Sequence, residues 1–184
     1  MSTEPQSATI ARAMVLSATI VLVMDQATKA LAVAALPAGG VSYGPVRLTV
    51  VRNSGGPFGV APGTSVWWTA VSLVALAALV LVAGRLVRAV RSAALLGVVV
   101  AGGMANVIDR LVRSPGSGNG AVVDWIQLSG YPRVFNLADV AIRVGALLLA
   151  VSMLTRPKPN DRRRELASEE SAGMPADAGR VEAS

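Results

Sequence analysis

Four apolar segments in this sequence are each long enough, or nearly long enough, to cross a membrane as a helix. A helix needs about 20 predominantly apolar residues to cross the hydrocarbon core of a bilayer. Of the 184 residues, 53% are hydrophobic and only 15% are charged, and the mean hydropathy is +0.55. These features predict an all-α membrane protein with four transmembrane helices. The predicted spans are residues 13–36, 66–83, 93–112 and 137–155.

Basic residues mark one side of the predicted bundle. They lie before the first span, between the second and third spans, and after the fourth span. Because lysine and arginine accumulate in short cytoplasmic loops, both termini are predicted to be cytoplasmic. Residues 1–12 are then a cytoplasmic segment, and residues 156–184, which are charged and small, are expected to be a disordered cytoplasmic tail. Residues 37–65 and 113–136 are expected to form the outer loops.

The first outer loop contains a strand signal. Residues 46–53, with the sequence VRLTVVRN, alternate β-branched and other residues, which predicts a short strand pair or a curved ribbon on the membrane surface. The glycines and prolines of residues 53–63 predict a tight connector after it. The expected fold is therefore four transmembrane helices with a small extracytoplasmic β-structured cap. Three further spans follow the first, so we interpret it as retained and not as a cleaved signal peptide.

Neither cysteine nor histidine occurs in the sequence. Their absence excludes disulfide frameworks, thiol nucleophiles, serine–histidine dyads and zinc sites built on histidine. The net charge is +6, but the basic residues lie beside apolar segments, a distribution typical of membrane topology and not of nucleic-acid binding. Any chemistry therefore depends on the remaining polar side chains or on the backbone.

Four of the eleven acidic residues lie within or beside the predicted spans, whereas the other seven lie in the terminal segments. Charged side chains within a membrane are energetically costly, so they are usually paired or functional. All four lie toward the predicted outer ends of the spans, whereas an ion or proton path would distribute acids through the full thickness. The pattern favours a site at the outer membrane face. The four residues are Asp25, Asp109, Asp124 and Asp139.

Two of these acids occur in motifs with a structural interpretation. Asp25 and Lys29 are four residues apart, so they share a helix face and are predicted to form an ion pair that anchors the first span, in preference to direct chemistry. Asn106 and Asp109 also share a helix face, and Arg110 follows them near the predicted membrane interface. For these three residues, structural support and substrate contact stand as equal alternatives.

The motif FNLAD at the start of the fourth span has a capping interpretation. Asn136 is a candidate N-cap, and Asp139 in the first turn suits the helix dipole. Capping does not explain Asp124, which lies between valine and tryptophan residues. Two carboxylates in a water-poor site share a proton, so one can activate water while the other polarises a carbonyl, as in aspartic proteases. The short turn between Asp124 and Asp139 would allow them to meet.

Five motifs, DQATK, NSGGPFG, GGMANVIDR, VVDW and FNLAD, occur in this order along the predicted topology. Together they resemble the bacterial lipoprotein signal peptidase family, also called signal peptidase II. The resemblance covers residues 13–155 and implies that Asp124 and Asp139 are the catalytic pair. It further implies substrate-binding or supporting positions at Asn53, Asn106, Asp109, Arg110, Asn136 and Ala138, and structural positions at Asp25 and Lys29.

The resemblance implies an intramembrane aspartic endopeptidase. Such an enzyme removes the signal peptide from diacylglyceryl-modified prolipoproteins by cleaving just before the lipidated cysteine. The expected location is the bacterial cytoplasmic membrane, crossed several times, with the active site on the extracytoplasmic side. No metal or organic cofactor is implied. The expected partners are lipid-modified prolipoproteins and membrane lipids, without nucleic acid, and a monomer is expected.

Two other classes of protein fit part of the pattern. The intramembrane charges also suit a small transporter or channel, but their one-sided depth and the absence of acids from the second span count against it. The other class is a non-enzymatic membrane scaffold in which the aspartates cap helices. The peptidase hypothesis differs from both because it requires Asp124 and Asp139 to reach a common water molecule.

Overall fold

The computed structural model describes residues 6–56 and 60–155. The described residues up to Ser152 form one compact unit. The elements below belong to this unit, apart from the last residues of the fourth helix. The predicted disordered tail at residues 156–184 lies outside the described residues, as do residues 57–59 at the centre of the NSGGPFG motif.

The described residues contain four helices, each long and apolar enough to cross a membrane. This finding confirms the four predicted spans. The first helix begins at Gln6 rather than at residue 13, because a helix satisfies its own backbone in water as well as in lipid and need not end with the apolar segment. The bounds are α1 Gln6–Ala35, α2 Ser65–Leu86, α3 Val90–Val112 and α4 Leu137–Leu154.

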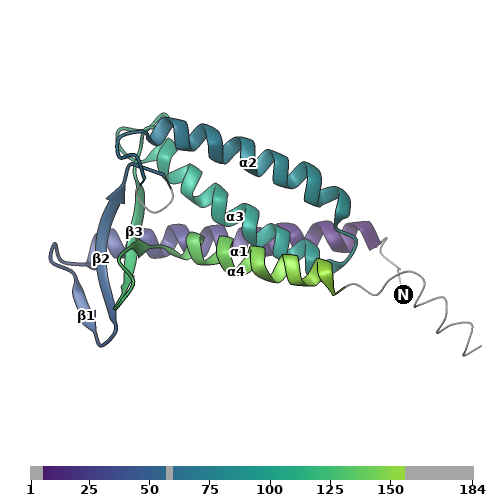
Figure 1. Ribbon diagram of the computed structural model, residues 1–184, viewed down its shortest axis with the longest axis horizontal. Helices are drawn as coiled ribbons and strands as arrows, with labels where there is room; N and C mark the ends of the chain where they lie inside the picture. The colour runs from purple at the N-terminus through teal and green to yellow at the C-terminus, as the bar shows by residue number, and fades with distance from the viewer. Residues whose placement is uncertain (1–5, 57–59, 156–184) are drawn as a thin grey trace, which may run out of the picture. The chain divides into compact units, whose positions relative to one another are not determined.

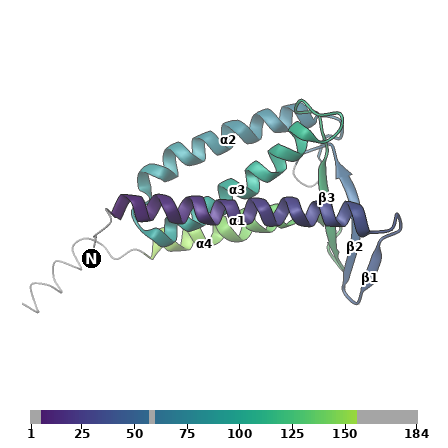
Figure 2. The ribbon, with the colours of Figure 1, turned by 180° about the vertical axis from the view of Figure 1, so that it is seen from behind.

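The central helix is α3. Figures 1 and 2 show it running between α2 on one side and α1 and α4 on the other. Eleven of its residues are buried, against three in each of the other helices. Glycines let its neighbours approach closely. A methyl group at Gly97 would clash with the Met14 carbonyl of α1, and one at Gly102 would lie 2.7 Å from the Ala138 carbonyl oxygen of α4.

An antiparallel sheet lies at one end of the helices, opposite the end at which α1 begins (Figure 1). Within the described residues it has four strands in the order β1–β2–β3–β4. The β-structured cap is thus confirmed. β2 matches the strand predicted at residues 46–53, whereas β3 lies where the sequence predicts only an outer loop. The bounds are β1 Val41–Tyr43, β2 Val46–Asn53, β3 Val122–Leu128 and β4 Val134–Phe135.

The pairing of β2 with β3 places two predicted site residues on one face of the sheet. Asp124 is opposite Val51, and Asn53 is opposite Val122. Because side chains two residues apart in a strand point to the same face, Asp124 and Asn53 become diagonal neighbours. The register shifts between Leu48 and Val51, and such a bulge bends a strand locally.

The segment from 113 to 121 connects α3 to β3 by folding back over the end of α3. The backbone N–H groups of Gly118 and Gly120 donate to the Arg110 carbonyl at 3.0 and 2.9 Å. From α2, the Ser65 hydroxyl donates to the Gly120 carbonyl at 2.5 Å, and the Thr69 hydroxyl donates to the Gly118 carbonyl at 2.8 Å. These bonds join α2, α3 and the start of β3, and so determine where Asp124 lies.

Candidate active site

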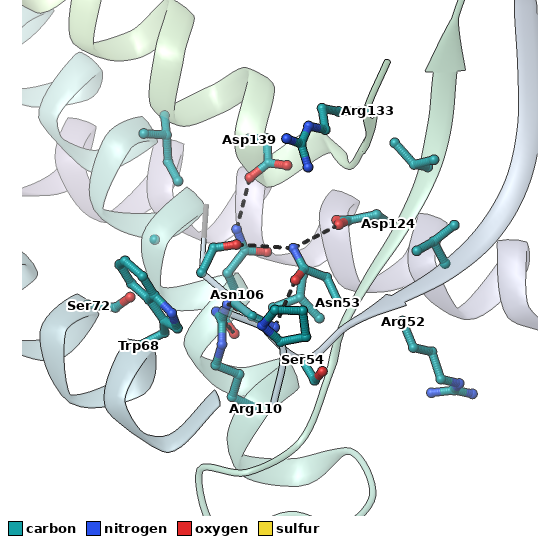
Figure 3. Close-up of a pocket in the computed structure, with 18 of the residues that line it drawn as sticks. Arg52, Asn53, Ser54, Trp68, Ser72, Asn106, Arg110, Asp124, Arg133 and Asp139 are labelled. Carbon is teal, nitrogen blue, oxygen red and sulfur yellow. Dashed lines mark hydrogen bonds between the residues drawn. The ribbon is translucent and has the colours of Figure 1, made fainter. Parts of the chain in front are cut away.

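A cavity of about 510 Å³ opens where the sheet meets the helices, with walls from β2, β3, α2, α3 and α4. Asp124 on β3 and Asp139 on α4 both line it, as Figure 3 shows. Asn53, Asn106 and Arg110 also line it. The structure therefore brings the two predicted catalytic residues to one cavity, together with three of the predicted supporting residues.

The carboxyl group of Asp124 is almost fully buried, with 4% of the residue exposed. It accepts a hydrogen bond from Asn136 Nδ2 at 2.6 Å and a longer one from Asn53 Nδ2 at 3.4 Å. Burial, and secondly the negative charge of Asp139, raise the pKa of Asp124 to about 7. Asp124 therefore carries its proton through the mildly acidic range and begins to lose it near neutral pH.

Asp139 lies in the first turn of α4 and is tied to the same asparagine. Its backbone N–H donates to Asn136 Oδ1 at 2.9 Å, which is the predicted N-cap bond. Its side-chain Oδ1 accepts a hydrogen bond from Asn106 Nδ2 at 3.2 Å. Since Asn136 also donates to Asp124, one side chain holds both members of the pair in place.

The other two intramembrane acids form a buried charge cluster with Lys29. The Lys29 ammonium lies 2.8 Å from Asp25 Oδ2, the predicted ion pair, and 2.9 Å from Asp109 Oδ2. All three side chains are fully buried. Asp109 also accepts from Arg113 Nε at 2.7 Å and from the Val123 N–H at 3.0 Å. Asp109 thus connects α1, α3 and the start of β3, and its contacts are those of structural support.

Arg110 extends from α3 to the connector that follows β2. Its Nη2 donates to the Gly55 carbonyl at 2.8 Å, and its Nη1 donates to the Asn106 carbonyl at 3.4 Å. Within the described residues, the buried Nε has no hydrogen-bond partner. Because Arg110 lines the cavity, its remaining N–H groups are donors available to a bound ligand.

Ala138 contributes its backbone to the network. It is fully buried, and its N–H donates to Asp25 Oδ1 at 2.8 Å. This bond satisfies one of the free N–H groups at the start of α4 with a charged acceptor. Ala138 and Asp25 thus fix the end of α4 from which Asp139 projects.

The cavity also contains residues that sequence reasoning does not single out. Trp68 and Ser72 line it from α2, and Arg143 lines it from α4 (Figure 3 labels the first two). Arg143 lies one turn after Asp139, and that spacing is the signal that could have found it. Trp68 offers no such signal, because its place depends on packing: a methyl group at Gly56 would clash with the Trp68 ring.

Comparison with known proteins identifies the family. The profile of the family described as signal peptidase (SPase) II matches residues 17–155, which include every site residue named above. The chain belongs to the signal peptidase II family. Membership of this family makes it a peptidase.

Curated members of the signal peptidase II family resemble the chain over most of its length. The lipoprotein signal peptidase of Rhodococcus jostii (strain RHA1) is 37% identical over 168 residues, which are 89% of this chain and 84% of the relative. That of Mycobacterium tuberculosis (strain H37Rv) is 36% identical over 137 residues, 73% of this chain and 67% of the relative. That of Leifsonia xyli is 36% identical over 157 residues, 84% of this chain and 71% of the relative.

Two solved structures have the same fold as this chain. One, described as a bacterial membrane enzyme structure at 2.3 Å resolution, has a TM-score of 0.63 and 24% sequence identity. The match covers 79% of this chain and 92% of that chain. A second, at 1.9 Å resolution, gives the same TM-score over 78% of this chain and 94% of that chain. The helices and sheet described above are therefore an arrangement that a known membrane enzyme also adopts.

Proposed function

We propose that this protein is an intramembrane aspartic endopeptidase that removes the signal peptide from diacylglyceryl-modified prolipoproteins. It cleaves just before the lipidated cysteine, at the outer face of the cytoplasmic membrane. The observation that carries the proposal is the shared position of Asp124 and Asp139 in one cavity, linked through Asn136. Family membership supports the reaction, and the pair, with Asp124 buried and Asp139 half-buried, supplies an acid and a base in a chain that has neither histidine nor cysteine.

In the proposed mechanism the two carboxyl groups have different protonation states. Asp139 is ionised and takes a proton from a water molecule, which attacks the carbonyl carbon of the scissile peptide bond. Asp124 is protonated and donates a hydrogen bond to the carbonyl oxygen as negative charge develops there. When the carbon–nitrogen bond breaks, Asp139 passes the proton that it took from water to the amine of the lipidated cysteine, and the signal peptide leaves with a new carboxyl group.

The supporting residues hold the pair and bind the substrate. Asn53, Asn106 and Asn136 donate hydrogen bonds to the two carboxyl groups. Arg110 provides N–H groups for a substrate carbonyl, in keeping with its unpartnered Nε among the described residues. Asp25 and Lys29 support the site from α1.

The substrate is proposed to enter sideways from the outer leaflet, with its acyl chains left among lipid. Next to Asp139, α4 exposes Val140, Val144 and Leu147, which make an apolar surface suited to lipid chains. The sheet lies at the end of the helices opposite the start of α1 (Figure 1), and its strands β2 and β3 line the cavity, so a cytoplasmic start of α1 corresponds to an extracytoplasmic site. A monomeric state and partners limited to prolipoproteins and membrane lipids, without nucleic acid, stay predictions.

The deciding experiment replaces each carboxyl group singly, as Asp124→Asn and Asp139→Asn. Each purified variant is incubated with a diacylated prolipoprotein, and release of the signal peptide is measured. Both changes are expected to lower the rate by at least about a thousandfold, since an amide can replace neither the acid nor the base. The matched control, Asp161→Asn in the predicted cytoplasmic tail, is expected to cleave at the wild-type rate. Full activity in either cavity variant would exclude the aspartic mechanism.

A further inference from the structure

Lys29 makes one contact that an ion pair does not require. Besides Asp25 and Asp109, its ammonium group donates to the side-chain oxygen of Asn106, with Nζ 3.0 Å from Oδ1. The three N–H groups of an ammonium ion are therefore all engaged, each on a different oxygen. The third contact connects the charge cluster to a residue that lines the cavity.

This contact determines which way the Asn106 amide faces. A lysine ammonium can only donate, so the amide oxygen must face Lys29 and the amide nitrogen must face away. The nitrogen then donates to Asp139 Oδ1 at 3.2 Å. Asn136 Nδ2 also donates to Asn106 Oδ1, at 3.2 Å, but it is neutral and is shared with Asp124. A reversed Asn106 amide would set donor against donor at Lys29 and acceptor against carboxylate at Asp139.

We propose that Lys29 is a positioning residue that, through Asn106, keeps Asp139 as the ionised member of the catalytic pair. A hydrogen-bond donor beside the Asp139 carboxyl group stabilises its ionised form, whereas an acceptor in the same place would require its protonated form. The orientation of Asn106 therefore selects the residue that activates water. The inference rests on the proposed function and assigns Lys29 a task beyond anchoring α1.

Other charges around the two carboxyl groups must be separated from this effect. The formal charges of the four ion-paired residues sum to zero, so removing Lys29 alone leaves a net negative charge. The four are Lys29, Asp25, Asp109 and Arg113. The charge of Lys29 also acts directly on Asp124 and lowers its pKa, against the larger opposing effects of burial and Asp139. The other charged residues that line the cavity are Arg52, Arg110, Arg133 and Arg143.

A pair of variants separates orientation from net charge. Lys29→Met removes both the charge and the donor, whereas the double variant Asp25→Asn/Lys29→Met removes the donor and leaves the cluster neutral. Asparagine at position 25 retains an oxygen for the Ala138 N–H. The rate of prolipoprotein cleavage is measured against pH, with kcat and KM determined separately.

Both variants are expected to lose kcat about tenfold near neutral pH while KM stays within about twofold. The acidic limb of the kcat profile is expected to move to higher pH by about one unit in both variants, while the fall in kcat above about pH 7 that Asp124 sets remains, so the active pH range becomes narrower. A wild-type profile in the double variant would show that net charge alone matters and would overturn the inference. So would failure of both variants to fold, since Lys29 would then be needed for folding rather than for positioning.

The control loosens the same helix interface without touching the network. Gly97→Ala places a methyl group against the Met14 carbonyl and the Ser17 hydroxyl of α1, away from the cavity. It is expected to lower thermal stability and to leave the pH profile unchanged. Asp124→Asn and Asp139→Asn are assayed in parallel. If they are inactive while the Lys29 variants keep the wild-type profile, only the positioning inference fails; if they cleave, the proposed function fails.

Discussion

Asn136 shows how one side chain can serve a helix and a site together. Its Oδ1 accepts the Asp139 N–H and caps α4, while its Nδ2 donates to Asp124. In the sequence, capping and catalysis are alternative interpretations of the FNLAD motif. The two uses are compatible because an amide has an acceptor and a donor on opposite atoms. The cap thereby orients the residue that holds the second carboxyl group.

Substitution of Asn136 separates these two uses. Asn136→Ser keeps an oxygen for the cap but is too short to reach Asp124, whereas Asn136→Ala loses both contacts. Both variants are expected to lose at least about tenfold in kcat, because Asp124 loses its shortest hydrogen bond. Only the alanine variant is expected to lose a further 1 kcal/mol or so of unfolding free energy from the missing cap. Full activity of the serine variant would contradict the role of Nδ2.

The pH dependence of activity follows from Asp124. Its pKa is raised to about 7, so the carboxyl group is protonated below neutral pH and ionised above it. The proposed mechanism uses the protonated form, so kcat is expected to fall as pH rises through about 7, by about tenfold per unit at higher pH. The measurement is kcat at saturating prolipoprotein from acidic to alkaline pH. A constant kcat up to about pH 9 would show that Asp124 is not the acid.

Among the elements, the connector between α3 and β3 has the most direct effect on the site. It is held by α2 hydroxyls and by carbonyls at the end of α3, so β3 starts at a defined place. The close approach requires glycine at position 120. A methyl group there would clash with the Arg113 carbonyl and would lie 2.8 Å from the Asp109 carbonyl oxygen.

Gly120→Ala tests this connector. The variant is expected to lose about 1–3 kcal/mol of unfolding free energy, because backbone carbonyls cannot move aside as a flexible side chain can. Activity is expected to fall with it, since β3 carries Asp124. Gly39→Ala is the control, because a methyl group at Gly39 has no neighbour within 4 Å among the described residues. Thermal unfolding in detergent gives the comparison, and equal stability of the two variants would refute the prediction.

At the scale of the whole molecule, the question is which end of the helices faces the cytoplasm. The chain contains no cysteine, so a thiol reagent can label only the cysteine that is introduced, and the labelling reports on which side of the membrane that position lies. Ala89 lies between α2 and α3, and Ser129 lies between β3 and β4, and both are exposed. In intact bacteria, a membrane-impermeant thiol reagent is expected to label Ser129→Cys, and to label Ala89→Cys only after permeabilisation. The reverse result would invert the predicted topology.

The elements that sequence reasoning predicts well are those that depend on local pattern. Each span is a long and predominantly apolar run, and half of the residues of β2 are β-branched. β3 is missed because its strand character depends on pairing with β2, from which its residues are distant in sequence. The candidate pair Asp124 and Asp139 is found by its unusual setting and by family resemblance, whereas the cavity that contains both depends on β3, α4 and the connector together.

The number of spans and the residue types available for chemistry follow from the amino-acid sequence alone. Each apolar segment crosses the bilayer as a separate helix that satisfies its own backbone hydrogen bonds. Segment length and composition are therefore sufficient to infer the number of spans. Two features depend on the packed fold: Lys29 contacts Asn106 as well as its two acids, and Asn136 joins Asp124 to Asp139. These contacts connect separate helices and strands, and their geometry results from packing around α3, which no local pattern records.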